Sequence, residues 1–279
     1  MNKFDGRYLD LCKDILSNGE LEDTRTGIKC LSVFGRSITY DLREGFPLLT
    51  TKKINFEAVA AELLWFLSGS TNVNDLPEKY RFIWKPWADN RGNCGPIYGK
   101  QWVDWVGLGV SLESPWADWN YFPKSVNQIE GLIKDLKTNP TSRRHIVSAW
   151  NVADLDDMAL PPCHMMFQLK AYPPYLDLQL YQRSCDVPVG VPYNIASYSL
   201  LLSMIAQEVG LTPRKFIHSM GDCHIYENQI EGINKQITRE PLEPCTLVLN
   251  NKPFWDLTLS DTRVDNYKSH PFIKFPVAV

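Results

Sequence analysis

"CHMMFQLKAYPPYLDLQLYQRS", residues 163–184, indicates two β-strands joined at a double proline. In the second half, Leu176, Leu178 and Leu180 alternate with polar or aromatic residues. This period of two is typical of a strand with one buried face. The sequence therefore predicts a hairpin whose apolar face packs on a core.

The loop of this hairpin determines which residues face each other. If Pro173 and Pro174 close it as a two-residue loop, Cys163 lies within one residue of facing Arg183. Directly opposed side chains are about 5 Å apart, although a double proline can require a wider loop. An arginine at that distance favours the thiolate, the form of cysteine that attacks carbon.

Two further segments have helical periodicity. Residues 55–69 are apolar on nearly every side, which predicts a buried helix. Glu62 lies in its middle, where a carboxylate is costly unless it is paired or used in chemistry. Residues 192–210 predict a long central helix that begins at Pro192 and carries Asn194 in its first turn.

The order of these elements indicates the fold class. Strands and helices follow one another in mixed order, and no linker or low-complexity tract divides the chain. We therefore expect one α+β domain over residues 1–279. Residues 106–125 are rich in Gly, Pro and aromatic residues, which predicts a long surface loop or insertion.

Composition excludes several classes of protein. A net charge of -3 argues against a dedicated nucleic-acid or membrane-surface binder. No stretch approaches the length of a membrane helix, and residues 1–16 resemble an amphipathic helix rather than a signal peptide, so we expect a cytoplasmic protein. The seven cysteines include no CxxC pair, which predicts buried reduced thiols and no metal site.

Cys163 is open to more than one interpretation. A cysteine in such a strand is more often a buried core residue than a nucleophile. A zinc deaminase also uses a Pro-Cys dipeptide, but it needs a second cysteine where this chain has Met166, and an upstream HxE that is missing. The remaining alternatives are a core thiol and a nucleophile.

Four arginines are candidates for a phosphate site. Arg25 lies in DTRTG, Arg143 and Arg144 lie in SRRH, and Arg183 precedes Ser184. Guanidinium groups clamp phosphate dianions, although adjacent arginines are more often surface charges.

Asn194 has a side chain that suits a pyrimidine. Its amide both donates and accepts, which matches the O4 and N3-H of uracil and mismatches cytosine. The alternative is a helix-start residue that satisfies backbone groups.

Taken together, the chain closely resembles the thymidylate synthase family, which also includes pyrimidine hydroxymethylases. The likeness covers nearly all of the chain in the family's order. It rests on DTRTG, LSVFGRSITYDL, GFPLLTTKK, AELLWFLSGSTNV, IWKPWAD, GPIYGKQW, SRRHIVSAWN, LPPCHMMFQ, LYQRSCDVPVGVPYNIASYS, GDCHIYENQ, REP and the terminal PVAV.

The resemblance implies a chemistry for the central residues. Cys163 would add to C6 of deoxyuridylate (dUMP), so that C5 attacks the methylene group of methylenetetrahydrofolate, the cosubstrate. Glu62 would manage protons through water, with a raised pKa. Tyr98 would help to remove the C5 proton, and His164 would support the nucleophile.

The resemblance also assigns the binding residues. The phosphate would be held by Arg25, Arg183 and Ser184, with Arg143 and Arg144 from the other subunit. Asn194 would read the uracil edge, and His224 and Tyr226 would bind the sugar hydroxyl. The folate would be bound by Asp186, Trp84 and Trp87, with Lys52 and Lys53 towards its acidic tail and PVAV closing over both ligands.

The implied protein is a homodimeric methyltransferase of dTMP biosynthesis, with shared active sites and no metal, membrane or required nucleic acid. The implied fold has a mixed β-sheet at the dimer interface, a long buried central helix and surrounding helices. Hydride transfer from the folate would give dTMP and dihydrofolate, whereas water would give the hydroxymethyl nucleotide. The departure Lys85-Pro86 beside Trp84 keeps a dUMP hydroxymethylase, and less so a dCMP hydroxymethylase, as the alternative.

The sequence disfavours two other classes of protein. A catalytically inactive nucleotide or RNA binder on the same fold is disfavoured by the intact Cys163, Glu62 and arginine set. A cysteine hydrolase pairing Cys163 with His224 lacks the local signature of that class.

Overall fold

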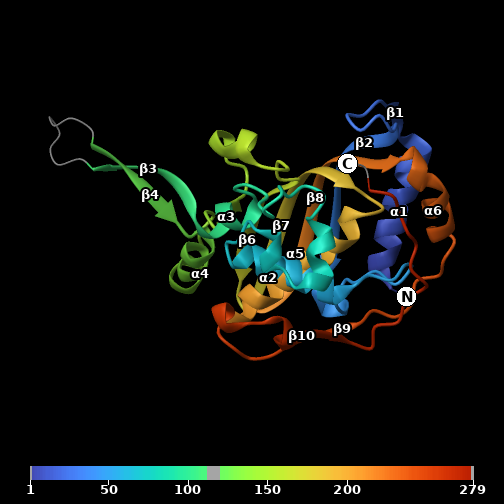
Figure 1. Ribbon diagram of the computed structural model, residues 1–279. Coiled ribbons are helices and arrows are strands. Elements are labelled where there is room, and N and C mark those ends of the chain that lie inside the picture. Colours follow the sequence, from blue (N-terminus) through green and yellow to red (C-terminus); the bar gives the residue numbers. More distant parts are fainter. Residues whose placement is uncertain (1, 112–119, 278–279) are drawn as a thin grey trace.

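The computed structural model describes residues 2–111 and 120–277 and shows the expected α+β architecture in one domain (Figure 1). A six-stranded mixed sheet has the order β1-β2-β8-β7-β6-β5. Only β7 and β8 pair in parallel; the other pairs of this sheet are antiparallel. The strands are β1 (Glu20–Glu22), β2 (Cys30–Asp41), β5 (Ile146–Ser148), β6 (His164–Tyr172), β7 (Tyr175–Asp186) and β8 (Thr212–Tyr226).

The helices of the described residues pack around this sheet. Their bounds are α1 (Lys3–Asn18), α2 (Phe56–Leu67), α3 (Tyr98–Val103), α4 (Gln128–Thr138), α5 (Gly190–Glu208) and α6 (Ile230–Gln236). None of the described helices is both long and apolar enough to cross a membrane.

The predicted central helix is confirmed. Helix α5 contacts β7, β8 and α2, and most of its residues are buried. It begins at Gly190, two residues before the Pro192 start that the sequence predicts. The predicted buried helix is also confirmed as α2, whose end is followed by Gly69 with φ of 74°. Helix α5 therefore covers one face of the sheet, and α2 packs against α5.

The predicted hairpin is confirmed, with one irregularity. Tyr172 pairs with Tyr175 across a two-residue proline loop, and this register continues to the pair Met166 and Tyr181. A bulge between His164 and Met166 then shifts the register by one residue, so that His164 pairs with Gln182. A bulge of this kind re-aims the side chains beyond it. It brings Cys163 opposite Arg183.

Residues 106–125 differ from the predicted loop. Residues 106–111 and 120–125 belong to a hairpin of β3 (Trp105–Ser111) and β4 (Asn120–Val126), which projects from the body in Figure 1. The glycine content predicted a loop, but Gly109 lies in a strand and leaves space for a side chain of the opposite strand. A Cβ on Gly109 would lie 2.5 Å from the ring of Phe122 on the opposite strand. Residues 112–119 lie outside the described residues.

A second small sheet pairs β9 (Thr246–Leu249) with β10 (Thr262–Asp265). All seven cysteines lie within the described residues and are free thiols. Six of them are buried, as predicted, and Cys163 alone is half-buried. Access to solvent therefore distinguishes Cys163 from the other cysteines.

Candidate active site

Arg183 anchors the segment that carries Cys163. Its backbone N–H donates to the carbonyl of Cys163 at 2.8 Å. Its guanidinium donates to the carbonyls of Pro161 and Pro162, both at 2.9 Å, and lies 5.4 Å from the ring centroid of Trp150. The Arg183 guanidinium thus binds the backbone carbonyls of both prolines that precede Cys163. The position of the thiol is fixed from the neighbouring strand.

The environment of the Cys163 thiol corrects one expectation. Burial raises the pKa of Cys163, and the opposing effect of the Arg183 charge is smaller. The arginine stabilises the thiolate, as expected, but the desolvation of the anion by burial has the larger effect on the pKa. The protein without ligands therefore holds a protonated thiol at neutral pH.

Tyr98 and His164 form a rigid wall beside the nucleophile. The Cys163 backbone N–H donates to the Tyr98 hydroxyl at 2.8 Å. The rings of Tyr98 and His164 stack with centroids 4.0 Å apart, and His164 Nδ1 lies 2.8 Å from the Tyr198 hydroxyl. Burial lowers the pKa of His164 to about 3. The imidazole is therefore neutral at physiological pH and is fixed on both sides.

Glu62 projects from the middle of α2 towards the same cluster. Its carboxylate accepts a hydrogen bond from Trp84 Nε1 at 2.7 Å. Burial raises the pKa of Glu62 to about 7, against the lowering effect of that bond, which confirms the raised pKa that was expected. The Trp84 ring lies edge-on to Tyr98, with centroids 5.8 Å apart, and 5.9 Å from Trp87. Glu62 is thus poised to exchange protons near neutrality.

The ends of β7 and β8 bring a second group of predicted residues together. In the parallel register, Ser184 pairs with Asp222 and Asp186 pairs with His224. His224 Nδ1 lies 2.6 Å from Asp222 Oδ1, and its ring is 5.1 Å from that of Tyr226. The two central strands of the sheet therefore present these side chains at the same end.

Asp186 is the last residue of β7 and lies four residues before the start of α5. Its carboxylate accepts a hydrogen bond from the N–H of Val189 at 3.0 Å, just before the helix begins. Burial raises the pKa of Asp186. Asn194 is the fifth residue of α5 and is half-buried; it lies in the second turn, not in the predicted first turn, because the helix begins at Gly190.

Lys52 has surroundings that the sequence did not predict. Its side chain is buried, its Nζ donates to the carbonyl of Pro188, and it lies 4.7 Å from the centroid of the Phe275 ring. Burial lowers the pKa of Lys52 to about 8. In this structure the ammonium turns inward towards the Asp186 region, whereas Lys53 is exposed. An acidic tail in solvent would meet Lys53 first.

The predicted phosphate arginines are not all gathered by one chain. Arg25 is exposed and lies close enough to Tyr226 to lower the pKa of that phenol slightly, against the dominant effect of burial. Arg143 and Arg144 are exposed just before β5, whose first residue, Ile146, pairs with Gln168. Gln168 is five residues along β6 from Cys163, a separation of roughly 17 Å at the usual strand rise.

Sequence reasoning missed Trp150, Tyr198 and Gln229. Trp150 stacks on Arg183, Tyr198 contacts His164, and Gln229 contacts Asp186. The signals were weak: Trp150 lies in SAWN and Tyr198 in the apolar run of the central helix. Each contacts a predicted site residue from a distant part of the chain, which no local pattern reveals.

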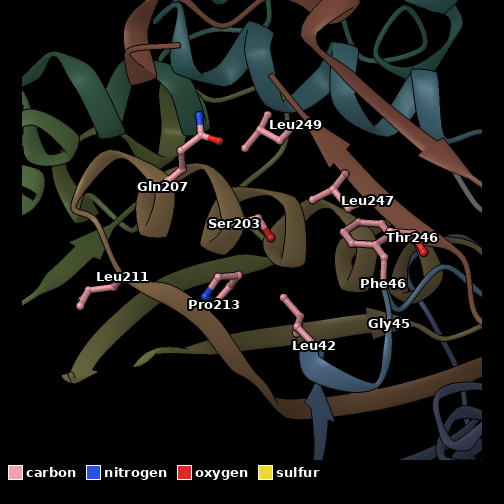
Figure 2. A pocket seen from close by; sticks show the side chains of 10 residues that line it. All are labelled: Leu42, Gly45, Phe46, Ser203, Gln207, Leu211, Pro213, Thr246, Leu247 and Leu249. Atoms are coloured by element: carbon pink, nitrogen blue, oxygen red, sulfur yellow. The ribbon is translucent and has the colours of Figure 1, made fainter. Parts of the chain in front are cut away.

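A cavity of about 380 Å³ lies elsewhere, between the second half of α5, β9 and the segment that precedes β8 (Figure 2). Apolar side chains such as Leu42, Phe46 and Leu247 line it, and Ser203 and Gln207 add polar groups. None of the predicted site residues contributes to its wall. The chemical groups, rather than this cavity, therefore mark the candidate active site.

Comparison with protein families agrees with the geometry. The family model described as Thymidylate synthase matches residues 6–279. The match includes every residue of the candidate site.

Proposed function

Because the chain belongs to the thymidylate synthase family, we propose that it converts dUMP to dTMP, with methylenetetrahydrofolate as the donor of both the carbon unit and the hydride. The family match by itself supports a methylation or hydroxymethylation reaction on dUMP. The covalent step that both reactions share is supported by the cluster of Cys163, Glu62 and Tyr98, whose contacts are described above.

Cys163 is the nucleophile of this proposal. Its sulfur bonds to C6 of the uracil ring, which makes C5 electron-rich enough to attack the one-carbon unit of the folate. The single observation that carries the proposal is that the half-buried Cys163 lies opposite Arg183, while the other six cysteines are buried. Covalent catalysis of this kind requires a sulfur that the substrate can reach and that is held in one place.

Glu62 and Tyr98 manage protons in the reaction. A carboxyl group with a pKa of about 7 is partly protonated and partly ionised at neutral pH, so it can both give and take a proton. Tyr98 is placed through its hydroxyl on the Cys163 backbone, and burial raises its pKa well above the ordinary value. Tyr98 therefore stays a neutral phenol that orients water or the C5 proton.

The binding residues form two groups, one for the nucleotide and one for the folate. Asn194 reads the uracil edge, and His224 and Tyr226 bind the sugar hydroxyl. The folate ring is held near Asp186, Trp84 and Trp87. A half-buried carboxylate and an indole pair suit a flat ring that carries N–H donors, so the residues present fit the cosubstrate.

The active enzyme is a homodimer in this proposal. Arg143 and Arg144 are too far along the sheet to reach a phosphate beside Cys163 of their own chain. A partner subunit that presents the same two arginines would complete the phosphate site. The catalytic domain of this proposal spans residues 1–279.

Mass analysis of the nucleotide product tests the proposal. With dUMP and methylenetetrahydrofolate, we expect a nucleotide heavier by one CH2 group, with dihydrofolate formed in equal amount. A product heavier by a further oxygen atom identifies the hydroxymethylase alternative, in which water adds in place of hydride. An unchanged nucleotide with both substrates present would contradict the proposal.

A further inference from the structure

Gln229 is a buried amide that no part of the proposed chemistry uses. It lies just after β8, and only 1% of its surface is exposed. Its Oε1 accepts the backbone N–H of Tyr226 at 3.0 Å. Its Nε2 donates to the carbonyl of Pro276 at 2.9 Å and lies 3.3 and 3.4 Å from the two carboxylate oxygens of Asp186.

These partners come from three separate parts of the chain. Tyr226 ends the strand assigned to the sugar, and Asp186 ends the strand assigned to the folate ring. Pro276 belongs to the C-terminal strap, a name used here for residues 271–277. One amide side chain therefore joins both halves of the proposed site to the strap.

The strap packs against the body of the protein next to Gln229. Phe275 is buried between Lys52 and Gly232: a Cβ at Gly232 would lie 2.4 Å from its ring. Ile273 is also buried, and Arg239 donates to the carbonyl of Pro271 at 2.8 Å. The strap is therefore docked as far as Pro276, and Gln229 makes the hydrogen bond closest to its end among the described residues.

We propose that Gln229 is a positioning residue that couples closure of the C-terminal strap to the placement of Asp186, and so controls the entry of water to the reacting carbon. This inference rests on the proposed function. An uncharged amide is required because it must accept from one backbone group while it donates to both a carbonyl and a carboxylate. A carboxylate in its place would keep the bond from Tyr226 but would repel Asp186.

The first test needs no substrate. Endoproteinase Lys-C cuts after Lys274, which is exposed, but the next residue, Phe275, must leave its seat. Cleavage then reports how often the strap is open. We expect cleavage at Lys274 to be about tenfold faster in Gln229→Glu, because a hydrogen bond is lost and a repulsion gained.

Gln207→Glu is the matched control. Gln207 Nε2 also donates to two backbone carbonyls, those of Asn250 and Lys252 at 3.0 and 3.2 Å, but at the far end of α5. The rate of cleavage at Lys274 in the Gln207→Glu variant should equal the rate in the wild type. An equal rate in Gln229→Glu and wild type, with both folded by circular dichroism, would overturn the coupling.

The second test uses turnover. In Gln229→Glu, the KM for methylenetetrahydrofolate should rise about tenfold while the KM for dUMP changes less than about twofold, because Asp186 is the displaced group. The fraction of hydroxymethyl product should rise as water enters. Gln229→Leu, which also loses the Tyr226 bond, should raise both KM values.

These readouts separate the two hypotheses. If the wild type does not turn over dUMP, the proposed function fails, and the Lys-C rates still decide whether Gln229 holds the strap. If the wild type is active but Gln229→Glu raises both KM values equally, with no change in product ratio, Gln229 is merely structural and the inference is wrong.

Discussion

Cys163 and Arg183 face each other across β6 and β7, joined by a 2.8 Å hydrogen bond from the Arg183 N–H to the Cys163 carbonyl. They do so because the bulge between His164 and Met166 shifts the last part of the hairpin by one residue. The same arginine holds the two proline carbonyls before the cysteine. The thiol is thus positioned by strand pairing and by a side chain from the partner strand.

The protonation of this thiol is directly measurable. Burial raises the pKa of Cys163 above its ordinary value of 9.0, so its alkylation by iodoacetamide should accelerate with pH through a midpoint above 9. Arg183→Leu should move that midpoint higher, since the arginine charge lowers this pKa. Peptide mass analysis identifies the alkylated residue, and Cys163→Ser is the blank. A midpoint below 9 in the wild type would show that the arginine outweighs burial.

Glu62→Gln should abolish most of the proton transfer and lower kcat by about 10²- to 10⁴-fold. The amide oxygen can still accept from Trp84, so packing is retained. In the wild type, kcat should depend on pH with a pKa near 7, and this dependence should disappear in the variant. Steady-state rates across pH measure both effects. A variant that keeps full kcat would exclude Glu62 from the chemistry.

The same residue should affect stability in a defined direction. The folded protein holds the Glu62 proton up to a pKa of about 7, whereas the unfolded chain loses it near 4.5, so stability attributable to this group falls as pH rises between these values. Glu62→Gln removes that loss. The Tm of the variant minus that of the wild type should therefore increase from about pH 5 to about pH 8. A difference that is constant with pH would contradict the raised pKa.

Asn194→Asp should shift substrate preference from dUMP towards dCMP. A protonated or ionised carboxyl group suits the exocyclic amine of cytosine, whereas the amide suits the O4 and N3-H of uracil. Competition between the two nucleotides gives the ratio of kcat/KM values directly, and we expect it to change by at least about tenfold. If the ratio is the same in both proteins, Asn194 does not read the base.

A shared phosphate site predicts complementation between inactive subunits. Subunits with Arg143→Ala and Arg144→Ala should be inactive, as should subunits with Cys163→Ser. A heterodimer of the two has one of its two sites with all residues intact, so each heterodimer should have up to about half the activity of a wild-type dimer. Native mass spectrometry verifies the heterodimer. Verified heterodimers without activity would argue that both arginines serve their own chain.

The sequence predicted those parts of the structure that depend on local periodicity. The alternation of Leu176, Leu178 and Leu180 identified β7, and the apolar surroundings of Glu62 identified both a buried helix and a raised pKa. The two-residue proline loop then placed Cys163 near Arg183. These features follow from spacing along one segment.

What the sequence could not predict depends on packing between distant segments. The pKa of Cys163 is raised by burial in the folded protein, which no motif around the cysteine records. Lys52 was expected to lie towards the acidic tail of the folate but is buried beside Phe275, more than 200 residues away in the sequence. Likewise, Gln229 comes close to Asp186 only when strands β7 and β8 pair, and close to Pro276 only when the strap docks.

Covalent capture of the nucleotide tests whether Cys163 is the nucleophile. In dUMP the hydrogen at C5 leaves as a proton, but a fluorine atom at C5 cannot leave in the same way. With the C5-fluoro analogue, the reaction should therefore stop while the Cys163 sulfur, the nucleotide and the folate are covalently joined. Intact-protein mass spectrometry after denaturation should show the wild type heavier by the nucleotide analogue and methylenetetrahydrofolate together, with the added mass on the Cys163 peptide. An unmodified wild-type protein, or the same added mass in Cys163→Ser, would contradict the proposed chemistry.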